Sequence, residues 1–212
     1  MIDLSDRLKK IYDLVSVFPV LDVGADHGYL SIMLENNIQK VYASEKNEGP
    51  YKNLLKTIED NHSKVIPLFM DGIDKLPNDV KTLIIVGMGG DTICDILKRG
   101  IDKLSQIEEI IIEPQISFSQ PITFLLNNGY IKTYGTIIFE KRYYPLLKFK
   151  KSDEILKYRE EDYYYGPYVI SNRDEMFIKM LLSQLKYYEK NNLLSYKKEE
   201  VKKIKKLLSL VK

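Results

Sequence analysis

The sequence lacks the residues that usually cross-link or anchor a protein. It has no tryptophan, two histidines and one cysteine among 212 residues. Cys94 therefore has no partner for an internal disulfide and is expected to pack inside a helix. No apolar run approaches the ~20 residues of a membrane span, and the first residues lack the apolar core of a signal peptide. We expect a cytoplasmic protein with no membrane contact and no metal ion.

Charge of one sign does not dominate either. Lysine and arginine number 32 against 30 aspartates and glutamates, which gives a net charge of +2. From residue 190 onward, however, eight basic side chains stand against two acidic ones. Such a stretch is explained by a solvated helix face or by a surface that binds the phosphates of a nucleic acid. The candidates for RNA contact are Lys197, Lys198, Lys202, Lys203, Lys205 and Lys206.

Apolar runs and amphipathic segments alternate over the first 128 residues. Strands are predicted at residues 18–23, 40–44, 65–69, 82–86 and 107–113. Helices are predicted at residues 4–17, 29–36, 48–61, 91–99 and 121–128. Continuously apolar strands are typical of a parallel sheet that is buried on both faces. An antiparallel hairpin at residues 130–139 and 143–149 would complete seven strands at the sheet edge.

Beyond residue 151 the strand pattern stops. A short helix is expected at residues 153–161, with a break at residues 163–167. Apolar side chains then recur at helical spacing, first at Ile178, Leu181, Leu185 and Tyr188, then at Val201, Ile204, Leu208 and Val211. This spacing predicts two helices packed as a coiled-coil-like hairpin. We therefore expect a monomer with a Rossmann-like α/β domain at residues 1–151 and a helical domain at residues 152–212.

The most informative motif follows the first predicted strand. It reads Asp22-Val23-Gly24-Ala25-Asp26-His27-Gly28-Tyr29, with acids between two glycines. Glycines at a strand-to-helix turn let the backbone approach a ligand closely. The dinucleotide fingerprint has three glycines, and acids at this turn would repel a pyrophosphate. The motif indicates a phosphate-free cofactor with a cationic head, such as S-adenosylmethionine (SAM).

Two further acids stand at the ends of the next strands. Glu45 closes the second strand 23 residues after Asp22, a spacing typical of a ribose-binding acid. Asp71, followed by Gly72, comes after the third strand, where it would face the adenine amino group of the cofactor. Each motif alone is common loop chemistry in α/β proteins. Three acids at successive strand ends favour a methyltransferase.

The run Gly87-Met88-Gly89-Gly90 follows the fourth strand, where a methyltransferase of this architecture presents the methyl group. Enzymes that methylate amino groups usually have Asn or Asp, two prolines and an aromatic residue here, and this chain does not carry that pattern. A nearly bare backbone suits the close approach of a flat base or of the cofactor. The alternative is a glycine-rich turn that only begins a helix.

Together these motifs resemble the bacterial tRNA (adenine-22-N1)-methyltransferase family. The resemblance rests on the run from Asp22 to Leu30, on Glu45 with Glu48-Gly49-Pro50, on Asp71-Gly72 and on Gly87-Met88-Gly89-Gly90. It covers almost the whole chain, including the helical tail. The family more often has Ser at Ala25, Ala at Gly28, and a Gln-Pro-Asn run where Glu113-Pro114-Gln115 stands.

The resemblance implies the class I methyltransferase fold and the transfer of a methyl group from SAM to N1 of adenine 22, in the D arm of tRNA. It implies that the helical tail helps to grip RNA. By position, the methionine and ribose of SAM would be held by Asp22, Gly24, Asp26, His27, Gly28 and Glu45, its adenine by Asp71 and Gly72, and the methyl group would be bordered by Gly87, Met88 and Gly89. Of these, Asp26, Gly87 and Met88 are the candidates for a catalytic role.

Other interpretations stay open on the sequence. A SAM-dependent methyltransferase that acts on rRNA, a protein or a small molecule would share these motifs. A non-catalytic protein that binds SAM and RNA would keep the same pocket. A dinucleotide oxidoreductase is disfavoured by the missing third glycine. His27 is equally well explained as a cofactor or base contact and as a structural imidazole. Arg7 has two interpretations, a side chain at the mouth of the pocket and a solvated surface side chain, and the second is the expected one.

Overall fold

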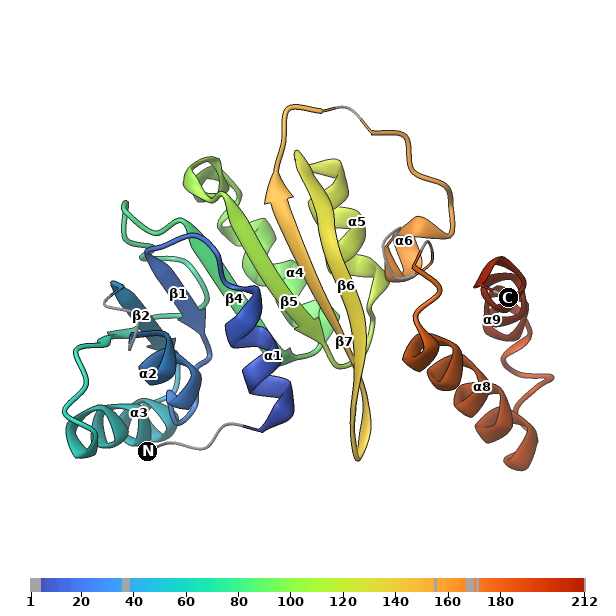
Figure 1. Cartoon of the computed structure of the whole chain (residues 1–212), viewed down its shortest axis with the longest axis horizontal. Coiled ribbons are helices and arrows are strands. Elements are labelled where there is room, and N and C mark those ends of the chain that lie inside the picture. The colour runs from blue at the N-terminus through green and yellow to red at the C-terminus, as the bar shows by residue number, and fades with distance from the viewer. Residues whose placement is uncertain (1–4, 36–38, 155, 167–169, 171, 212) are drawn as a thin grey trace.

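Figure 1 shows a computed structural model of the chain, which describes residues 5–35, 39–154, 156–166, 170 and 172–211. Seven strands form one sheet in the order β3-β2-β1-β4-β5-β7-β6. Their bounds are β1 Val20–Val23, β2 Val41–Glu45, β3 Ile66–Phe69, β4 Thr82–Met88, β5 Glu109–Pro114, β6 Tyr130–Glu140 and β7 Arg142–Lys151. Strands β1 to β5 run parallel, and β7 runs antiparallel to both of its neighbours.

Helices cover both faces of the sheet and make a core on each. On one face lie α1 (Asp6–Leu14), α2 (Tyr29–Glu35) and α3 (Glu48–Asp60). On the other lie α4 (Gly90–Arg99) and α5 (Ser119–Asn127), and the 3-10 helix η1 (Ile101–Gln106) connects α4 to β5. Strand side chains alternate between the faces. Val20 and Leu21 of β1 are accordingly both fully buried, one in each core.

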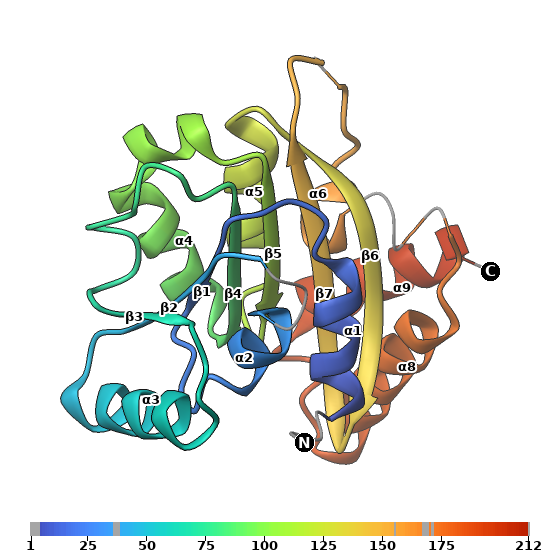
Figure 2. The ribbon, with the colours of Figure 1, turned by 60° about the vertical axis from the view of Figure 1, so that its left-hand side comes forward.

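The C-terminal helices pack against the sheet beside β6. They are α6 (Asp162–Tyr165), α8 (Glu175–Lys190) and α9 (Lys198–Val211). Helix α8 contacts both β6 and α9, as the views of Figures 1 and 2 agree. Phe177 of α8 and Leu208 of α9 belong to the same apolar cluster as Ile93 and Leu125. The core therefore continues without a break from the sheet into the tail.

Most elements predicted from the sequence are present, and the seven-stranded, mostly parallel sheet is confirmed. Ser5 caps α1 by accepting the N–H of Leu8 at 3.4 Å. The predicted starting residue of that helix, Leu4, and the predicted end of the next one, Asn36, lie outside the described residues. Among the residues described, no helix has both the length and the apolar character needed to cross a bilayer.

Two expectations were wrong in detail. The described residues between 153 and 161 form no helix, because Leu156 stays exposed and an apolar stripe there would have no surface to cover. A short helix, α6, forms instead across the expected break. The carboxylate of Asp162 accepts the backbone N–H of Arg159 at 2.9 Å and pairs with its guanidinium, which holds this helix start.

Candidate active site

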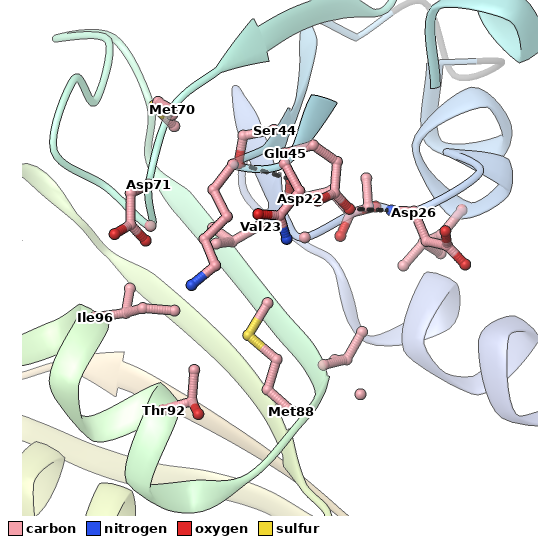
Figure 3. A pocket seen from close by; sticks show the side chains of 18 of the residues that line it. Asp22, Val23, Asp26, Ser44, Glu45, Met70, Asp71, Met88, Thr92 and Ile96 are labelled. Atoms are coloured by element: carbon pink, nitrogen blue, oxygen red, sulfur yellow. Dashed lines mark hydrogen bonds between the residues drawn. The ribbon is translucent and has the colours of Figure 1, made fainter. Parts of the chain in front are cut away.

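A cavity of about 1060 Å³ opens at the edge of the sheet where β1, β2 and β4 end (Figure 3). Ligands of open α/β sheets commonly bind outside the carboxyl ends of the strands, and this volume suits a cofactor. Nine of the eleven cofactor and catalytic residues predicted from the sequence line the cavity: Asp22, Gly24, Asp26, His27, Glu45, Asp71, Gly72, Gly87 and Met88. The three strand-end acids therefore do converge on one site.

Asp22 is the most buried of these acids, with 2% of its surface exposed. Its Oδ2 accepts a hydrogen bond from Ser31 Oγ at 2.7 Å, so that α2 fixes the direction of the carboxylate. Burial raises the pKa of Asp22 to about 6, although the Ser31 hydrogen bond acts in the opposite direction. A cationic group placed beside it would favour the ionised form.

Glu45 ends the neighbouring strand and shapes the first loop. Its Oε1 accepts the backbone N–H of Asp26 at 2.6 Å, and Asp26 adopts a left-handed φ of 52°. Burial raises the pKa of Glu45, and the Asp26 N–H opposes that shift. The side chain of Asp26 itself is 69% exposed. The carboxylate of Glu45 is therefore buried beneath the loop, whereas that of Asp26 lies at the mouth of the cavity.

His27 of the first loop and Tyr29, the first residue of α2, form a flat wall. Their rings stack with centroids 5.4 Å apart and an interplanar angle of 13°. Both residues line the cavity. A pair of parallel rings suits contact with a base or with the adenine of a cofactor, which keeps both ligand interpretations of His27 open.

Met88 crosses from the end of β4 to the first loop. A β-carbon on Gly24 would overlap the terminal methyl of Met88, and Gly24 also adopts a left-handed φ of 72°. Figure 3 shows the Met88 side chain reaching into the cavity between Asp71 and Asp26. Glycine at position 24 therefore serves both the backbone turn and the seating of Met88.

Strand β4 extends two residues beyond the predicted end at 86, so Gly87 and Met88 belong to it and the Gly87–Gly90 run spans its end. The run faces the cavity only at its start. Gly87 has a φ of 76°, and a β-carbon there would meet nothing within 4 Å. By contrast, the N–H of Gly90 bonds to the carbonyl of Ile116 at 2.8 Å, and a β-carbon on Gly90 would strike the carbonyl of Ser117. The later glycines of the run thus let two loops pack together.

Gly28 and Gly89 lie outside the lining of the cavity. The space beside Gly28 is filled by Leu54 of α3, and Gly89 faces Ile116. A β-carbon on Gly28 would overlap Leu54, whereas one on Gly89 would make ordinary contact with Ile116, so packing requires glycine only at position 28. The cofactor contact expected of both stays a prediction.

Asp71 is paired with a residue that the sequence did not single out. Arg99, at the end of α4, donates to both of its carboxylate oxygens, at 3.0 and 3.1 Å. These hydrogen bonds lower the pKa of Asp71. Both side chains line the cavity and are about half exposed. No motif signals Arg99, because its role depends on where α4 ends in space.

Arg7 reaches the cavity, contrary to the expectation of a solvated side chain. Its Nη1 donates to both carboxylate oxygens of Glu113 at 2.9 Å. Glu113 is fully buried behind the glycine run, where the N–H of Gly87 also bonds to it. Burial raises the pKa of Glu113 even though Arg7 lowers it. The departure from the family's Gln at position 113 therefore comes with a buried ion pair.

The six lysines near the C-terminus fall into two groups. Lys197 pairs with Glu200 at 2.9 Å, Lys203 lies over the ring of Tyr164, and Lys206 pairs with Glu161. The other group, Lys198, Lys202 and Lys205, is exposed and spaced by four and three residues along α9. That spacing places its members on one face of the helix. This second group is called the lysine face below.

Several lining residues were not predicted, including Ser44, Lys46, Thr92 and Ile96. Ser44 precedes Glu45 at the end of β2, so its position could have been read from the strand pattern. Within the described part of the chain, no group of three or more His, Cys, Asp or Glu side chains is placed to hold a metal ion.

The strand order and the acid-lined cavity define a class I SAM-dependent methyltransferase. The sequence also matches the profile of one family, the tRNA (adenine(22)-N(1))-methyltransferases (TrmK), over residues 20–212. The chain belongs to this family, whose members use SAM to methylate N1 of adenine 22 in tRNA. The family predicted from the sequence is therefore confirmed.

Individual relatives agree with this assignment. The chain is 25% identical over 195 residues to the tRNA (adenine(22)-N(1))-methyltransferase of Bacillus subtilis (strain 168), covering 87% of this chain and 82% of that protein. It is 26% identical to Streptococcus pneumoniae Sp1610 in complex with S-adenosyl-L-methionine, with a TM-score of 0.89 and coverage of 99% and 100%. TrmK of M. capricolum, in complex with S-adenosyl-homocysteine, shares the fold at 24% identity, with a TM-score of 0.78 and coverage of 99% of each chain.

Proposed function

We propose that, in the methylation of tRNA adenine 22, residues 1–151 hold SAM and the reacting base while residues 152–212 help to hold the RNA. The observation that carries the first half is the convergence of Asp22, Glu45 and Asp71 around one cavity next to Gly87. The cavity suits SAM chemically, because carboxylates can hold its ammonium group and its ribose hydroxyls. SAM supplies an electrophilic methyl group on a sulfonium when it is bound.

In this proposal each acid has a separate task. Asp22 and Asp26 hold the methionine end, Glu45 holds the ribose, and Asp71 orients the cofactor adenine. The ion pair with Arg99 fixes Asp71 in place, and the side chain stays partly exposed at the cavity. Gly24 and Gly87 keep the backbone clear of the path of the methyl group, and Met88 fills the space beside Gly24.

The reaction needs no strong base from the protein. Adenine N1 carries a free lone pair at neutral pH, so it attacks the methyl without first losing a proton. Alignment of the reacting atoms is the main contribution available, worth up to ~7–11 kcal/mol for well-oriented groups. The product is a cation, which nearby carboxylates such as Asp26 stabilise. N1 lies on the pairing edge, so the adenine has to leave its stack before it reacts.

For the tail, we propose that the lysine face binds RNA phosphates. Lys197, Lys203 and Lys206 already have partners within the chain, whereas the lysine face points outward. We also propose that the protein works as a monomer in the cytoplasm. The apolar stripes of α8 and α9 support a monomer, because they pack into the chain's own core. Light scattering at micromolar concentration tests this directly, and a dimer would contradict it.

The deciding experiment for the function is a methylation assay. The protein is incubated with labelled SAM and an unmodified tRNA transcript, and the RNA is digested to nucleosides. We expect label in 1-methyladenosine only, and none with a transcript that carries guanosine at position 22. Label in a different nucleoside, or in protein, would assign the chain to another substrate. Binding of SAM without any transfer would leave a non-catalytic role.

A further inference from the structure

The β6–β7 hairpin extends past the rest of the sheet on the side of the active site. Strand β7 is antiparallel to β5 and pairs with it from Lys150 to Leu147 only. The hairpin pairing continues beyond that point, from Ile137 opposite Pro145 to Glu140 opposite Arg142. Because β6 runs in the same direction as β5, its free end lies at the edge where β4 and β5 end. Figure 1 shows this projecting loop.

The end of the hairpin, residues 139–143, is called the hairpin tip here, and it combines an exposed ring with two cations. The side chain of Phe139 is 52% exposed, and its ring packs on that of Tyr143 with centroids 4.9 Å apart. Lys141 forms the turn, Arg142 begins β7, and both are exposed. An exposed ring supported by a second ring beside two cations presents both surfaces that single-stranded RNA uses, a flat face for a base and positive charge for phosphates.

The one acid in the hairpin tip is directed to the protein. Glu140 lies 3.5 Å from Nε of Arg7, whose guanidinium also stands over the ring of Tyr144, 5.0 Å from its centroid. Arg142 contacts the same ring and donates from Nε to its hydroxyl at 2.7 Å. With Glu140 paired to Arg7, the outward charge of the hairpin tip is positive.

Arg7 connects the hairpin tip to the methyl-transfer site. Arg7 bonds to Glu113, and Glu113 accepts the N–H of Gly87. The hairpin tip is therefore fixed relative to the cavity by a chain of direct contacts. An RNA strand that delivers its adenine to the cavity has its neighbouring nucleotides at this edge of the sheet.

We propose that the hairpin tip is an RNA-binding element that holds nucleotides next to the target adenine. Phe139 stacks on an unpaired base, while Lys141 and Arg142 contact the flanking phosphates. The inference rests on the proposed function, since it takes tRNA as the substrate. It adds a second contact region that is separate from the lysine face of α9.

The test uses the full-length protein with three variants. Phe139→Ala removes the ring, Lys141→Asn removes a charge at a φ of 64° that asparagine tolerates, and Arg142→Gln removes the other charge. Leu55→Ala and Lys56→Gln on the exposed face of α3 are the matched controls. For each protein, tRNA affinity, its dependence on salt, SAM affinity, melting temperature and kcat/KM are measured.

We expect Phe139→Ala to weaken tRNA binding about fivefold or more without changing the salt dependence. Lys141→Asn and Arg142→Gln should each lower the slope of log affinity against log salt by about one. SAM affinity and melting temperature should match those of the controls. tRNA affinities within twofold of wild type for all three variants would overturn the proposal, and so would a loss that follows SAM affinity or melting temperature. Absence of 1-methyladenosine with the wild-type protein would instead contradict the proposed function, because tRNA affinity is measured without turnover.

Discussion

Met88 Cε occupies the space that a β-carbon on Gly24 would need, so the end of β4 and the loop after β1 fit together only with glycine at position 24. Gly24→Ala should therefore lower the free energy of unfolding by about 2–4 kcal/mol, from the left-handed backbone and the overlap together. SAM affinity should fall with it. Combining it with Met88→Ala removes the overlap and should restore part of the stability. Chemical unfolding of the four proteins of this cycle measures the coupling, and strictly additive losses would contradict the contact.

Asp22→Asn should change stability and cofactor binding in opposite directions, with higher stability and weaker SAM binding. The pKa of Asp22 in the folded protein, about 6, lies above its ordinary value near 3.8. The folded protein thus binds this proton more tightly than the unfolded chain, so the associated stability is present below pH ~4 and is lost as the pH rises through 6. The neutral asparagine should raise the stability without SAM at pH 8 by ~1–3 kcal/mol, and should weaken SAM binding. Equal melting temperatures of the two proteins at pH 8 would count against the buried-charge explanation.

Gly87 borders the cavity and has free space beside it, so a substitution acts through the backbone. Gly87→Ala forces alanine to a φ of 76° at a cost of about 1–2 kcal/mol. A shift of the loop should lower kcat by about 100-fold, and Gly87→Val should be worse because its branched β-carbon tolerates that φ less. Gly49→Ala on α3 is the matched control, with no neighbour within 4 Å and no left-handed φ. It should keep full activity. A turnover of Gly87→Ala equal to that of the wild type would contradict the proposal that Gly87 borders the transferring methyl group.

The side chains of Arg7 and Glu113 form an ion pair, so removing one of them should lower the free energy of unfolding more than removing both. Arg7→Gln leaves a fully buried carboxylate without its partner, which should cost up to ~3–5 kcal/mol. The double variant with Glu113→Gln carries a neutral pair and should recover most of that loss. Urea unfolding of both single variants and of the double variant measures the coupling. If the double variant is no more stable than Arg7→Gln, the pair is not the cause.

The two groups of lysines near the C-terminus allow a comparison between two triple variants that lose the same charge. Replacing Lys198, Lys202 and Lys205 by glutamine should reduce tRNA affinity and lower the salt slope by about three. The same replacement at Lys197, Lys203 and Lys206 should affect the slope less, because these side chains have partners inside the protein. A filter-binding titration over a range of salt gives both slopes. Equal slopes for the two triple variants would falsify the assignment of the lysine face.

The sheet and the strand-end acids were predictable because they depend on local patterns. Apolar runs gave the strands, and the positions of Asp22, Glu45 and Asp71 after those runs placed them at one edge. Arg7 and Arg99 were not predictable in the same way. Arg7 meets Glu113 across 106 positions of sequence, and a side chain on a helix shows no sign of such a partner until the helix is docked.

The segment before α6 was mispredicted for a related reason. Its composition permits a helix, but a helix forms only where an apolar stripe is covered, and Leu156 stays exposed. The sequence did not separate the glycines of the Gly87–Gly90 run by role. Gly90 is glycine because the loop at Ser117 packs on it, which no motif for ligand binding distinguishes from a cofactor contact.

The unbroken apolar core between the sheet and the tail fixes the distance between the cavity and α9. With Phe177 and Leu208 buried in the same cluster as Ile93, the span from the methyl-transfer cavity to α9 is set by packing rather than by a hinge. In the binding mode proposed above, an RNA is accepted when its target base and the backbone segment bound by the lysine face lie that far apart in its folded shape.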